Sequence, residues 1–180
     1  MRTVTYGAAC SLDGFITGPG GSLDWLHFSR DVEDVMARYW STVDAVLMGR
    51  KTWEFAAGQG LGGEGTEGSG GLPPVATYLF SRTLQKAPAG VKLVSVDAGG
   101  FVNRLKRRPG KGICVMGGSE LANSLFEAGA IDEVSLNVHP VLLGSGVPFF
   151  RPLSRRVPLE LAEARSISGG CVLLTYRVVR

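Results

Sequence analysis

Hydrophobic and polar residues follow one another along this chain in blocks that predict strands separated by helices. Eight short segments have the apolar or alternating pattern of strands, and they cover residues 3–10, 44–48, 77–80, 91–96, 112–116, 134–138, 159–167 and 171–179. The early segments are nearly continuous apolar runs, which are typical of parallel strands buried on both faces. The last two are joined through Ser168-Gly169-Gly170, a turn sequence that predicts an antiparallel hairpin.

Helical periodicity appears between these segments. The clearest case is an apolar stripe that follows three acidic residues suited to a first helical turn, and its members are Val32, Val35, Met36, Tyr39, Trp40 and Val43. Further helices are predicted after Thr52, over residues 101–108, and from Leu121 to a stop at Gly129. We therefore predict an α/β fold, with a mostly parallel mixed sheet of about eight strands, about four helices on its two faces and an antiparallel C-terminal hairpin.

Composition and charge narrow the class of protein. The 180 residues are 44% apolar and 19% charged, with a net charge of +3, which indicates a single globular domain over residues 1–180. Lys and Arg are scattered apart from residues 104–108, so a nucleic-acid surface is not indicated. No apolar run is long enough to span a bilayer, and the N-terminus lacks the apolar core of a signal peptide. We expect a cytoplasmic protein.

The cysteines and histidines suggest neither disulfides nor a metal site. Cys10, Cys114 and Cys171 are far apart and lie in apolar runs, so we expect buried thiols. His27 and His139 have no metal-ligand spacing, and a structural role is favoured for each. We predict no bound metal.

Three loops carry the residues that we expect to bind a ligand. Each directly follows a predicted strand, and in a parallel sheet such loops meet at the carboxyl edge, where ligands bind. They combine glycines, hydroxyls and cations: Gly49-Arg50-Lys51-Thr52, Ser81-Arg82-Thr83 and Gly117-Gly118-Ser119-Glu120. Glycines before a helix start let phosphates approach the backbone, and Arg pairs with phosphate through two hydrogen bonds.

An elongated ligand with phosphates in two places fits these loops, and NADPH is the obvious candidate. Gly117 and Gly118 would accept a pyrophosphate, while Arg50, Lys51 and Arg82 would hold a further phosphate. The sequence has neither the G-x-G-x-x-G fingerprint nor a P-loop. For residues 49–52 taken alone, a merely solvated basic helix start stays open.

Catalytic residues leave a weaker signal, because no G-x-S-x-G elbow is present. Asp13 ends the first strand beside a Gly-rich stretch, which we expect to be a mobile loop over residues 11–21, and its carboxylate could face a substrate. The alternative for Asp13 is an Asx-turn that starts this loop. Asp31 is expected to be a helix N-cap and not an acid catalyst. Trp25 and Trp53 could stack on a flat ring, although packing is the safer expectation.

Several of these motifs resemble those of a known family. Met48-Gly49-Arg50-Lys51-Thr52-Trp53-Glu54 resembles the Gly-Arg-x-Thr-Trp-Glu segment of dihydrofolate reductases. The loops at Ser81 and Gly117 fall where those enzymes carry their other cofactor loops. Ser11-Leu12-Asp13-Gly14 and residues 141–150 are more similar to the reductase domain of bacterial riboflavin biosynthesis and its small stand-alone relatives. The order of the predicted elements matches over nearly the whole chain.

The resemblance implies an NADPH-dependent reductase with a dihydrofolate reductase-like fold. It places Asp13 near the substrate and the backbone around Ala9 and Ile16 beside the nicotinamide. The other cofactor contacts that it implies are Gly49, Arg50, Lys51, Thr52, Ser81, Arg82 and Thr83 at the adenosine phosphates, and Gly117, Gly118, Ser119, Glu120 and Leu121 at the pyrophosphate.

We therefore expect hydride transfer from NADPH to a small heterocyclic substrate, either pteridine-like or aminopyrimidine-like. Two alternatives stay open: a nucleotide- or pteridine-binding protein without turnover, and a riboflavin-pathway 5-amino-6-(5-phosphoribosylamino)uracil reductase. The first is motivated by the predicted first helix, where dihydrofolate reductases carry a buried acid and the nearest acid of this chain, Asp31, falls at the helix start. Residues 141–150 and the final hairpin could supply a homodimer surface or could fold back onto the core. The Gly-rich stretch 56–74 is expected to be a flexible surface loop.

Overall fold

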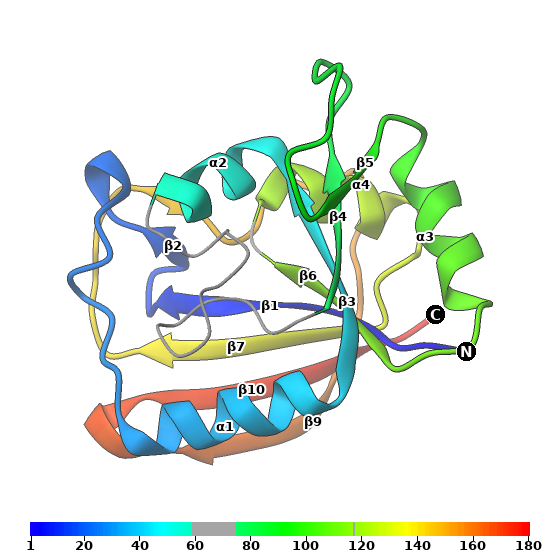
Figure 1. Ribbon diagram of the computed structural model, residues 1–180. Helices are drawn as coiled ribbons and strands as arrows, with labels where there is room; N and C mark the ends of the chain where they lie inside the picture. Colours follow the sequence, from blue (N-terminus) through cyan, green and yellow to red (C-terminus); the bar gives the residue numbers. More distant parts are fainter. Residues whose placement is uncertain (59–74, 117) are drawn as a thin grey trace.

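The computed structural model describes residues 1–58, 75–116 and 118–180. Figure 1 shows the main elements, which in chain order are β1 (Val4–Ser11), β2 (Phe15–Thr17), α1 (Arg30–Ser41), β3 (Val43–Gly49), α2 (Arg50–Gly58), β4 (Ala76–Phe80), β5 (Val91–Val94), α3 (Ala98–Lys106), β6 (Gly112–Met116), α4 (Ser119–Glu127), β7 (Glu133–His139), β8 (Val147–Pro148), β9 (Leu159–Ser166) and β10 (Val172–Val178). Most of the predicted stretch 56–74 lies outside the described residues.

In the described part of the chain, eight strands form one sheet in the order β5-β4-β3-β6-β1-β7-β10-β9. The pairs from β5 to β7 are parallel, whereas β10 is antiparallel to both β7 and β9. The predicted fold class is thereby confirmed, including the antiparallel C-terminal hairpin.

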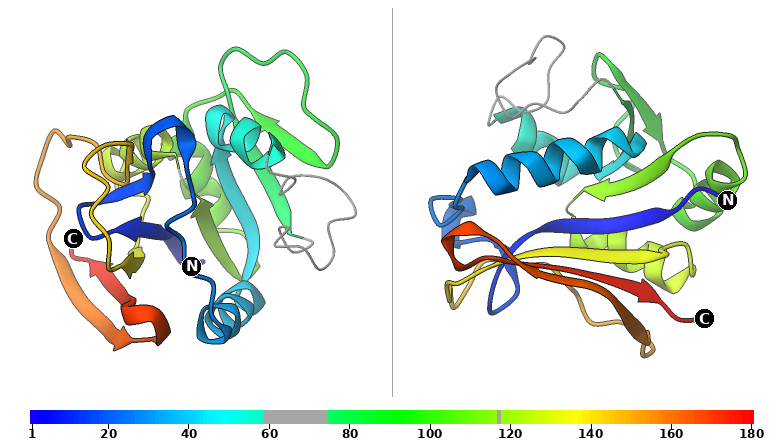
Figure 2. Two further views of the ribbon diagram at one scale, coloured as in Figure 1. Left: turned by 90° about the vertical axis from the view of Figure 1, so that its left-hand side faces the viewer. Right: turned by 90° about the horizontal axis from the view of Figure 1, so that it is seen from below.

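Helices cover both faces of this sheet, as Figure 2 shows. The strand β3 contributes to the packing on both faces, because its successive side chains point to opposite faces. Leu47 belongs to the core cluster that contains residues of α3 and α4, whereas Val46 and Met48 belong to a second cluster, against which Tyr39 and Trp40 of α1 and Trp53 of α2 pack. A strand buried on both faces reads as a continuous apolar run, which explains the sequence of β3.

The close approach of α3 to the end of α4 requires a glycine. A Cβ atom placed on Gly99 would lie 2.3 Å from the Cβ of Ala128, so no side chain fits there. Because Gly99 and Gly100 belong to the helix, α3 begins at Ala98, three residues earlier than predicted. Asp97 caps it by accepting a hydrogen bond from the backbone N–H of Gly100 at 2.6 Å.

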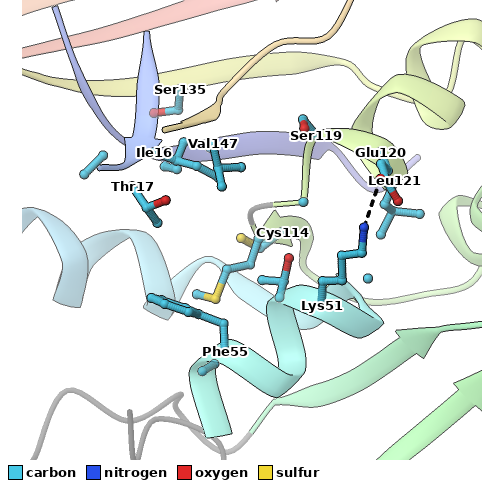
Figure 3. Close-up of a pocket in the computed structure, with 18 of the residues that line it drawn as sticks. Ile16, Thr17, Lys51, Phe55, Cys114, Ser119, Glu120, Leu121, Ser135 and Val147 are labelled. Carbon is cyan, nitrogen blue, oxygen red and sulfur yellow. Dashed lines mark hydrogen bonds and ion pairs between the residues drawn. The ribbon is translucent and has the colours of Figure 1, made fainter. Parts of the chain in front are cut away.

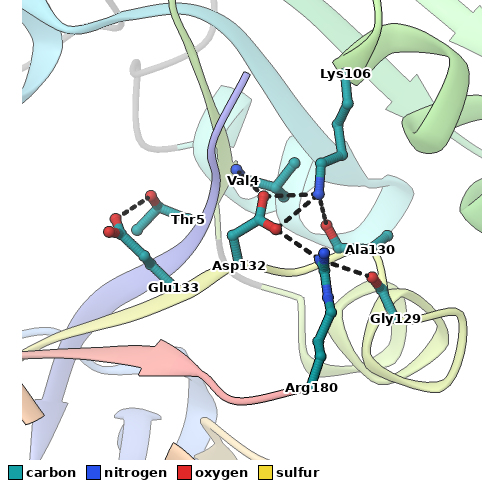
Figure 4. Close-up of polar contacts among 8 residues, drawn as sticks. All are labelled: Val4, Thr5, Lys106, Gly129, Ala130, Asp132, Glu133 and Arg180. Atoms are coloured by element: carbon teal, nitrogen blue, oxygen red, sulfur yellow. Dashed lines mark hydrogen bonds and ion pairs between the residues drawn. The ribbon is translucent and has the colours of Figure 1, made fainter. Parts of the chain in front are cut away.

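A buried lysine forms an ion pair at the amino-terminal edge of the sheet. Lys106 is only 4% exposed, and its Nζ donates to Asp132 Oδ1 at 2.8 Å and to the carbonyl oxygen of Ala130 at 3.3 Å. Asp132 also accepts from the backbone N–H of Val4 at 2.9 Å and from the guanidinium of Arg180 at 2.6 Å (Figure 4). The carboxylate therefore ties β1, α3 and the end of the chain together.

Two local predictions are wrong. Asp31 is not the N-cap of α1; Ser29 is, through a hydrogen bond from the backbone N–H of Val32 to its Oγ at 3.4 Å. Asp31 lies in the first turn and accepts hydrogen bonds from the N–H and hydroxyl of Ser168, so it ties α1 to the β9–β10 turn. The predicted loop over residues 11–21 contains the short strand β2, which pairs with β8. A three-residue strand is too short for its period to be read from sequence.

Candidate active site

The three predicted ligand loops meet at one edge of the sheet. They follow β3, β4 and β6, which are adjacent parallel strands, so their carboxyl ends lie at the same edge. Two of the loops touch: a Cβ atom placed on Gly118 would lie 2.8 Å from Thr52 Oγ1 and 3.9 Å from the backbone N of Gly49. Residues far apart in the chain therefore form one surface.

A single cavity of about 1640 Å³ runs along this edge and over the sheet. Every predicted cofactor residue that the structure describes lines it: Ala9, Ile16, Gly49, Arg50, Lys51, Thr52, Ser81, Arg82, Thr83, Gly118, Ser119, Glu120 and Leu121. Gly117 lies outside the described residues. Drug-sized ligands occupy cavities of about 300–1,000 Å³, so the volume here exceeds what one such ligand requires.

The start of α4 is suited to an anion. Its N-cap residue, Gly118, has a φ of 73° and supplies no side-chain acceptor to the first turn. The N–H groups of the first turn therefore point out of the helix at the positive end of its dipole. The left-handed backbone and the closeness of Thr52 together explain why this position is glycine.

Charged side chains cluster beside this helix start. Glu120 lies between two cations, at 3.4 Å from Lys51 Nζ and 3.0 Å from a guanidinium nitrogen of Arg151. Arg151 also donates from Nε to Ser119 Oγ at 3.3 Å, and it lines the cavity. Figure 3 shows the Lys51–Glu120 pair at one end of the cavity, with Ile16, Thr17 and Ser135 toward the other. No sequence pattern marks Arg151, because it follows an apolar segment far along the chain.

The loop after β4 is organised by its own hydroxyl. Ser81 Oγ accepts hydrogen bonds from the backbone N–H groups of Thr83 and Leu84 at 3.2 and 3.1 Å. Ser81 is 8% exposed, so the loop is held firmly at the strand end while Arg82 is exposed. Arg82 and Arg50 line the same cavity, which is the arrangement predicted for a phosphate beyond the pyrophosphate.

Comparison with known proteins assigns a family to this arrangement. Residues 75–173 match the RibD C-terminal domain family. The chain is also 30% identical to the protein YyaP of Bacillus subtilis (strain 168), itself uncharacterized, over 180 residues that cover 98% of this chain and 95% of YyaP. The chain belongs to the RibD C-terminal domain family. Family membership supports an oxidoreductase.

Solved structures agree with this RibD C-terminal domain assignment at the level of the fold. A protein from Shewanella sp. PV-4, described provisionally as a riboflavin biosynthesis protein, superimposes with a TM-score of 0.84 at 24% identity, covering 99% of this chain and 100% of that one. Dihydrofolate reductase from Enterococcus faecalis, solved with NADP(H) and RAB-propyl, superimposes with a TM-score of 0.69 at 18% identity, covering 99% and 97%. The predicted dihydrofolate reductase-like fold is thereby confirmed.

In this RibD C-terminal domain, Asp13 holds a loop. Its carboxylate accepts hydrogen bonds from the backbone N–H groups of Leu143 at 3.1 Å and Gly144 at 2.7 Å, and from Ser11 Oγ at 2.6 Å. These bonds lower the pKa of Asp13 below its ordinary value, the Ser11 hydroxyl contributing most. Among the described residues that line the cavity, Asp13 does not occur. A catalytic role for Asp13 stays a prediction, and its contacts favour the positioning of residues 141–150.

The buried histidine belongs to a packed cluster. His139 is 2% exposed; its Nδ1 lies 3.5 Å from Cys171 Sγ and accepts from the backbone N–H of His27 at 3.4 Å. The ring of Trp25 packs edge-on against it at 5.2 Å. Burial lowers the pKa of His139, so the imidazole is neutral at physiological pH. The three cysteines are buried and free, as predicted.

Among residues 1–58, 75–116 and 118–180, no group of three His, Cys, Asp or Glu side chains could hold a metal ion. Within the same ranges, no helix has the length and apolar character needed to cross a bilayer.

Proposed function

We propose that this protein is an NADPH-dependent oxidoreductase that reduces a small heterocyclic substrate. The observation that carries the proposal is the single cavity, which joins three glycine-, hydroxyl- and cation-bearing loops to an open face of the sheet. When bound, NADPH would supply the hydride. The chain's part is to hold the dinucleotide and the substrate against one another and to exclude water.

The residues at the sheet edge fit this cofactor. The open backbone of α4 at Gly118 offers N–H donors to a pyrophosphate, and Thr52 Oγ1 lies beside it. Arg50 and Arg82, on neighbouring loops, would hold the 2′-phosphate that distinguishes NADPH from NADH, because a guanidinium donates two parallel hydrogen bonds to phosphate. Ala9 and Ile16, which also line the cavity, would border the nicotinamide.

The test is a comparison of cofactor affinities in two arginine variants. Arg82→Ala should raise the Kd for NADPH about tenfold or more, because a charge-assisted pair is lost, and should leave the Kd for NADH nearly unchanged. Arg107→Ala removes an exposed charge at the C-terminal end of α3 and serves as the control. Isothermal titration calorimetry measures each Kd. Equal loss of both cofactors in Arg82→Ala would refute the role at the 2′-phosphate.

Turnover separates the proposal from its alternatives. A reductase oxidises NADPH in the presence of a suitable acceptor, which the absorbance of NADPH reports directly. Tight cofactor binding without oxidation by any member of a broad pteridine and pyrimidine panel would favour a binding protein. Rapid oxidation with 5-amino-6-(5-phosphoribosylamino)uracil, the substrate named for the reductase from Thermotoga maritima, would favour the riboflavin-pathway role.

We also propose that the chain forms a homodimer through the β9 edge of its sheet. Every residue of β9 is exposed, including Leu159 at 41% and Leu161 at 54%. An edge strand that carries exposed leucines and open backbone groups favours pairing with another strand. In residues 141–150, Phe149 is buried against Tyr6 at a ring distance of 4.3 Å, whereas Leu142 is 70% exposed. Light scattering should find a dimer that Leu161→Lys converts to a monomer, and a wild-type monomer would refute the proposal.

A further inference from the structure

The cavity extends beyond the proposed nicotinamide position toward α1, and this α1 end lies between α1 and the strands β7 and β10. Asn137 of β7 is in register with Ala9 of β1 and Leu173 of β10, and Ser135 is in register with Gly7 and Thr175. Paired residues on neighbouring strands project from the same face of a sheet. Ser135, Asn137 and Thr175 therefore form a floor that continues directly from Ala9, and all line the cavity.

The side chains of this floor are polar and uncharged, and hydrogen bonds within the protein do not satisfy all polar atoms here. Within the described residues, the side-chain oxygens of Asn137 and Thr17 are buried and have no hydrogen-bond partner, although both residues line the cavity. Buried polar atoms without a partner are rare, and in a ligand cavity the missing partner is expected to come from the ligand. A half-turn of the Asn137 amide exchanges its oxygen and nitrogen, so the side chain can present an acceptor and a donor side by side.

The described residues that surround the α1 end supply no carboxylate without a cationic partner. From α1, the apolar residues Val32, Val35 and Met36 and the cationic Arg38 line the cavity, while the acidic residues of its first turn do not. Glu163 is the one carboxylate among the described residues of α1, β7, β9 and β10 that line this end, and it pairs with Arg165 at 3.5 Å. A cationic ring would therefore find no counter-charge on the floor.

From this geometry we propose that the α1 end binds an uncharged planar heterocycle through a lactam edge, and that Asn137 determines this specificity. This inference rests on the proposed reductase function. In a lactam a ring N–H stands next to a C=O, so one primary amide can accept from the first and donate to the second. A carboxylate at the same position would select the opposite pattern, the two adjacent donors of a protonated aminopyrimidine. The apolar side chains of α1 would cover the ring from the other side.

The experiment compares two ligands that share a ring and differ at this edge. Lumazine (pteridine-2,4-dione) presents lactam edges, and 2,4-diaminopteridine presents amino groups in their place. Each is titrated by calorimetry into the wild-type protein at neutral pH, with and without NADP⁺. Lumazine should bind at least about tenfold more tightly than the diamino compound, because mismatched hydrogen-bonding groups discriminate strongly. Equal affinity, or preference for the diamino compound, would overturn the proposal.

Two variants test the residue itself. Asn137→Leu keeps the size of the side chain and should lose about tenfold or more in lumazine affinity, while Asn137→Asp should shift the preference toward the diamino compound. Lumazine binding by Asn137→Leu at wild-type strength would overturn the assignment. If either variant fails to fold, the side-chain amide resonances of Asn137 in the wild-type protein decide the matter, since they should shift on addition of lumazine and not of the diamino compound.

NADPH binding is measured separately in every sample. Loss of lumazine discrimination with intact NADPH binding refutes the lactam site and leaves the reductase proposal standing. Lumazine discrimination without NADPH binding supports the lactam site and refutes the reductase proposal. If neither lumazine discrimination nor NADPH binding is found, both proposals are refuted.

Discussion

Glu120 is the residue at which the electrostatics of the proposed cofactor site can be tested most directly. Its carboxylate lies 3.4 Å from Lys51 Nζ and 3.0 Å from Arg151, so it competes with a bound pyrophosphate for both cations. We predict that Glu120→Gln strengthens NADPH binding, whereas Arg151→Gln weakens it. Gln keeps the shape of Glu and removes its negative charge, whereas Arg151→Gln removes a positive charge together with the hydrogen bond from Arg151 Nε to Ser119 Oγ.

The magnitude follows from the geometry. The side chains of Lys51, Arg151 and Glu120 are 76%, 48% and 56% exposed, and exposed ion pairs contribute only about 0–1 kcal/mol to stability. Both variants should therefore melt close to the wild-type temperature. A unit charge about 5 Å from a phosphate contributes about 0.8 kcal/mol in water and about 3 kcal/mol near a protein surface. With roughly half-exposed groups, about 1–1.5 kcal/mol is expected, or a change of about five- to tenfold in Kd.

Calorimetric titration with NADPH at low and high salt provides the assay. The gain in Glu120→Gln and the loss in Arg151→Gln should both shrink at high salt, because the groups are exposed. The double variant should bind with nearly wild-type affinity if the two charges act on the same phosphate. Weaker NADPH binding by Glu120→Gln would refute this reasoning, because it would mean that the carboxylate itself contacts the cofactor or positions the cations.

Three further predictions concern the backbone, the edge cluster and Asp13. Gly118→Ala should weaken NADPH binding more than tenfold, because a Cβ would intrude toward Thr52. The control is Gly129→Ala, at a φ of 61° with nothing within 4 Å, which costs ~1–2 kcal/mol of backbone strain, as Gly118→Ala does, and should leave the Kd unchanged. Equal Kd values for the two variants in calorimetry would contradict this prediction. Asp132→Asn should lower the free energy of unfolding by about 3–5 kcal/mol in urea titrations, because it leaves the buried Lys106 without a counter-charge, whereas Arg180→Gln should have a much smaller effect. Because the pKa of Asp13 is lowered in the folded protein, its contribution to stability is present above its ordinary pKa and is lost as the pH falls through the folded value. The difference in melting temperature between wild type and Asp13→Asn should therefore disappear in acid, and a constant difference would contradict this.

The sequence predicted those features that depend on local pattern. The apolar runs of the buried parallel strands identified the sheet, and the glycines and cations after β3, β4 and β6 identified loops that line the cavity, because each signal lies within a few neighbouring residues. The resemblance to a known family added Ala9 and Ile16, which no local pattern marks.

Other features depend on contacts between distant parts of the chain. Arg151 reaches Ser119 across 32 residues, and Asp13 reaches Gly144 across 131, so neither partner could be read from sequence. The capping of α1 was misassigned because Ser29 and Asp31 are both good N-caps, and only the contact with Ser168 decides between them. No local pattern marks Asn137, because the strands beside it on the sheet, and therefore its neighbours Ala9 and Leu173, are brought there by distant parts of the chain.

The segment that follows β7 is held to Asp13 through Leu143 and Gly144, to Gly14 through Phe149, and to Glu120 through Arg151, and Val147 of the same segment lines the cavity. We expect a change at one of these contacts to alter the position of the others. Dinucleotide and heterocycle should consequently show thermodynamic linkage, each altering the affinity of the other by the same factor. Asp13→Asn, which weakens the contact with Leu143 and Gly144, should reduce that factor toward one, even though Asp13 does not line the cavity.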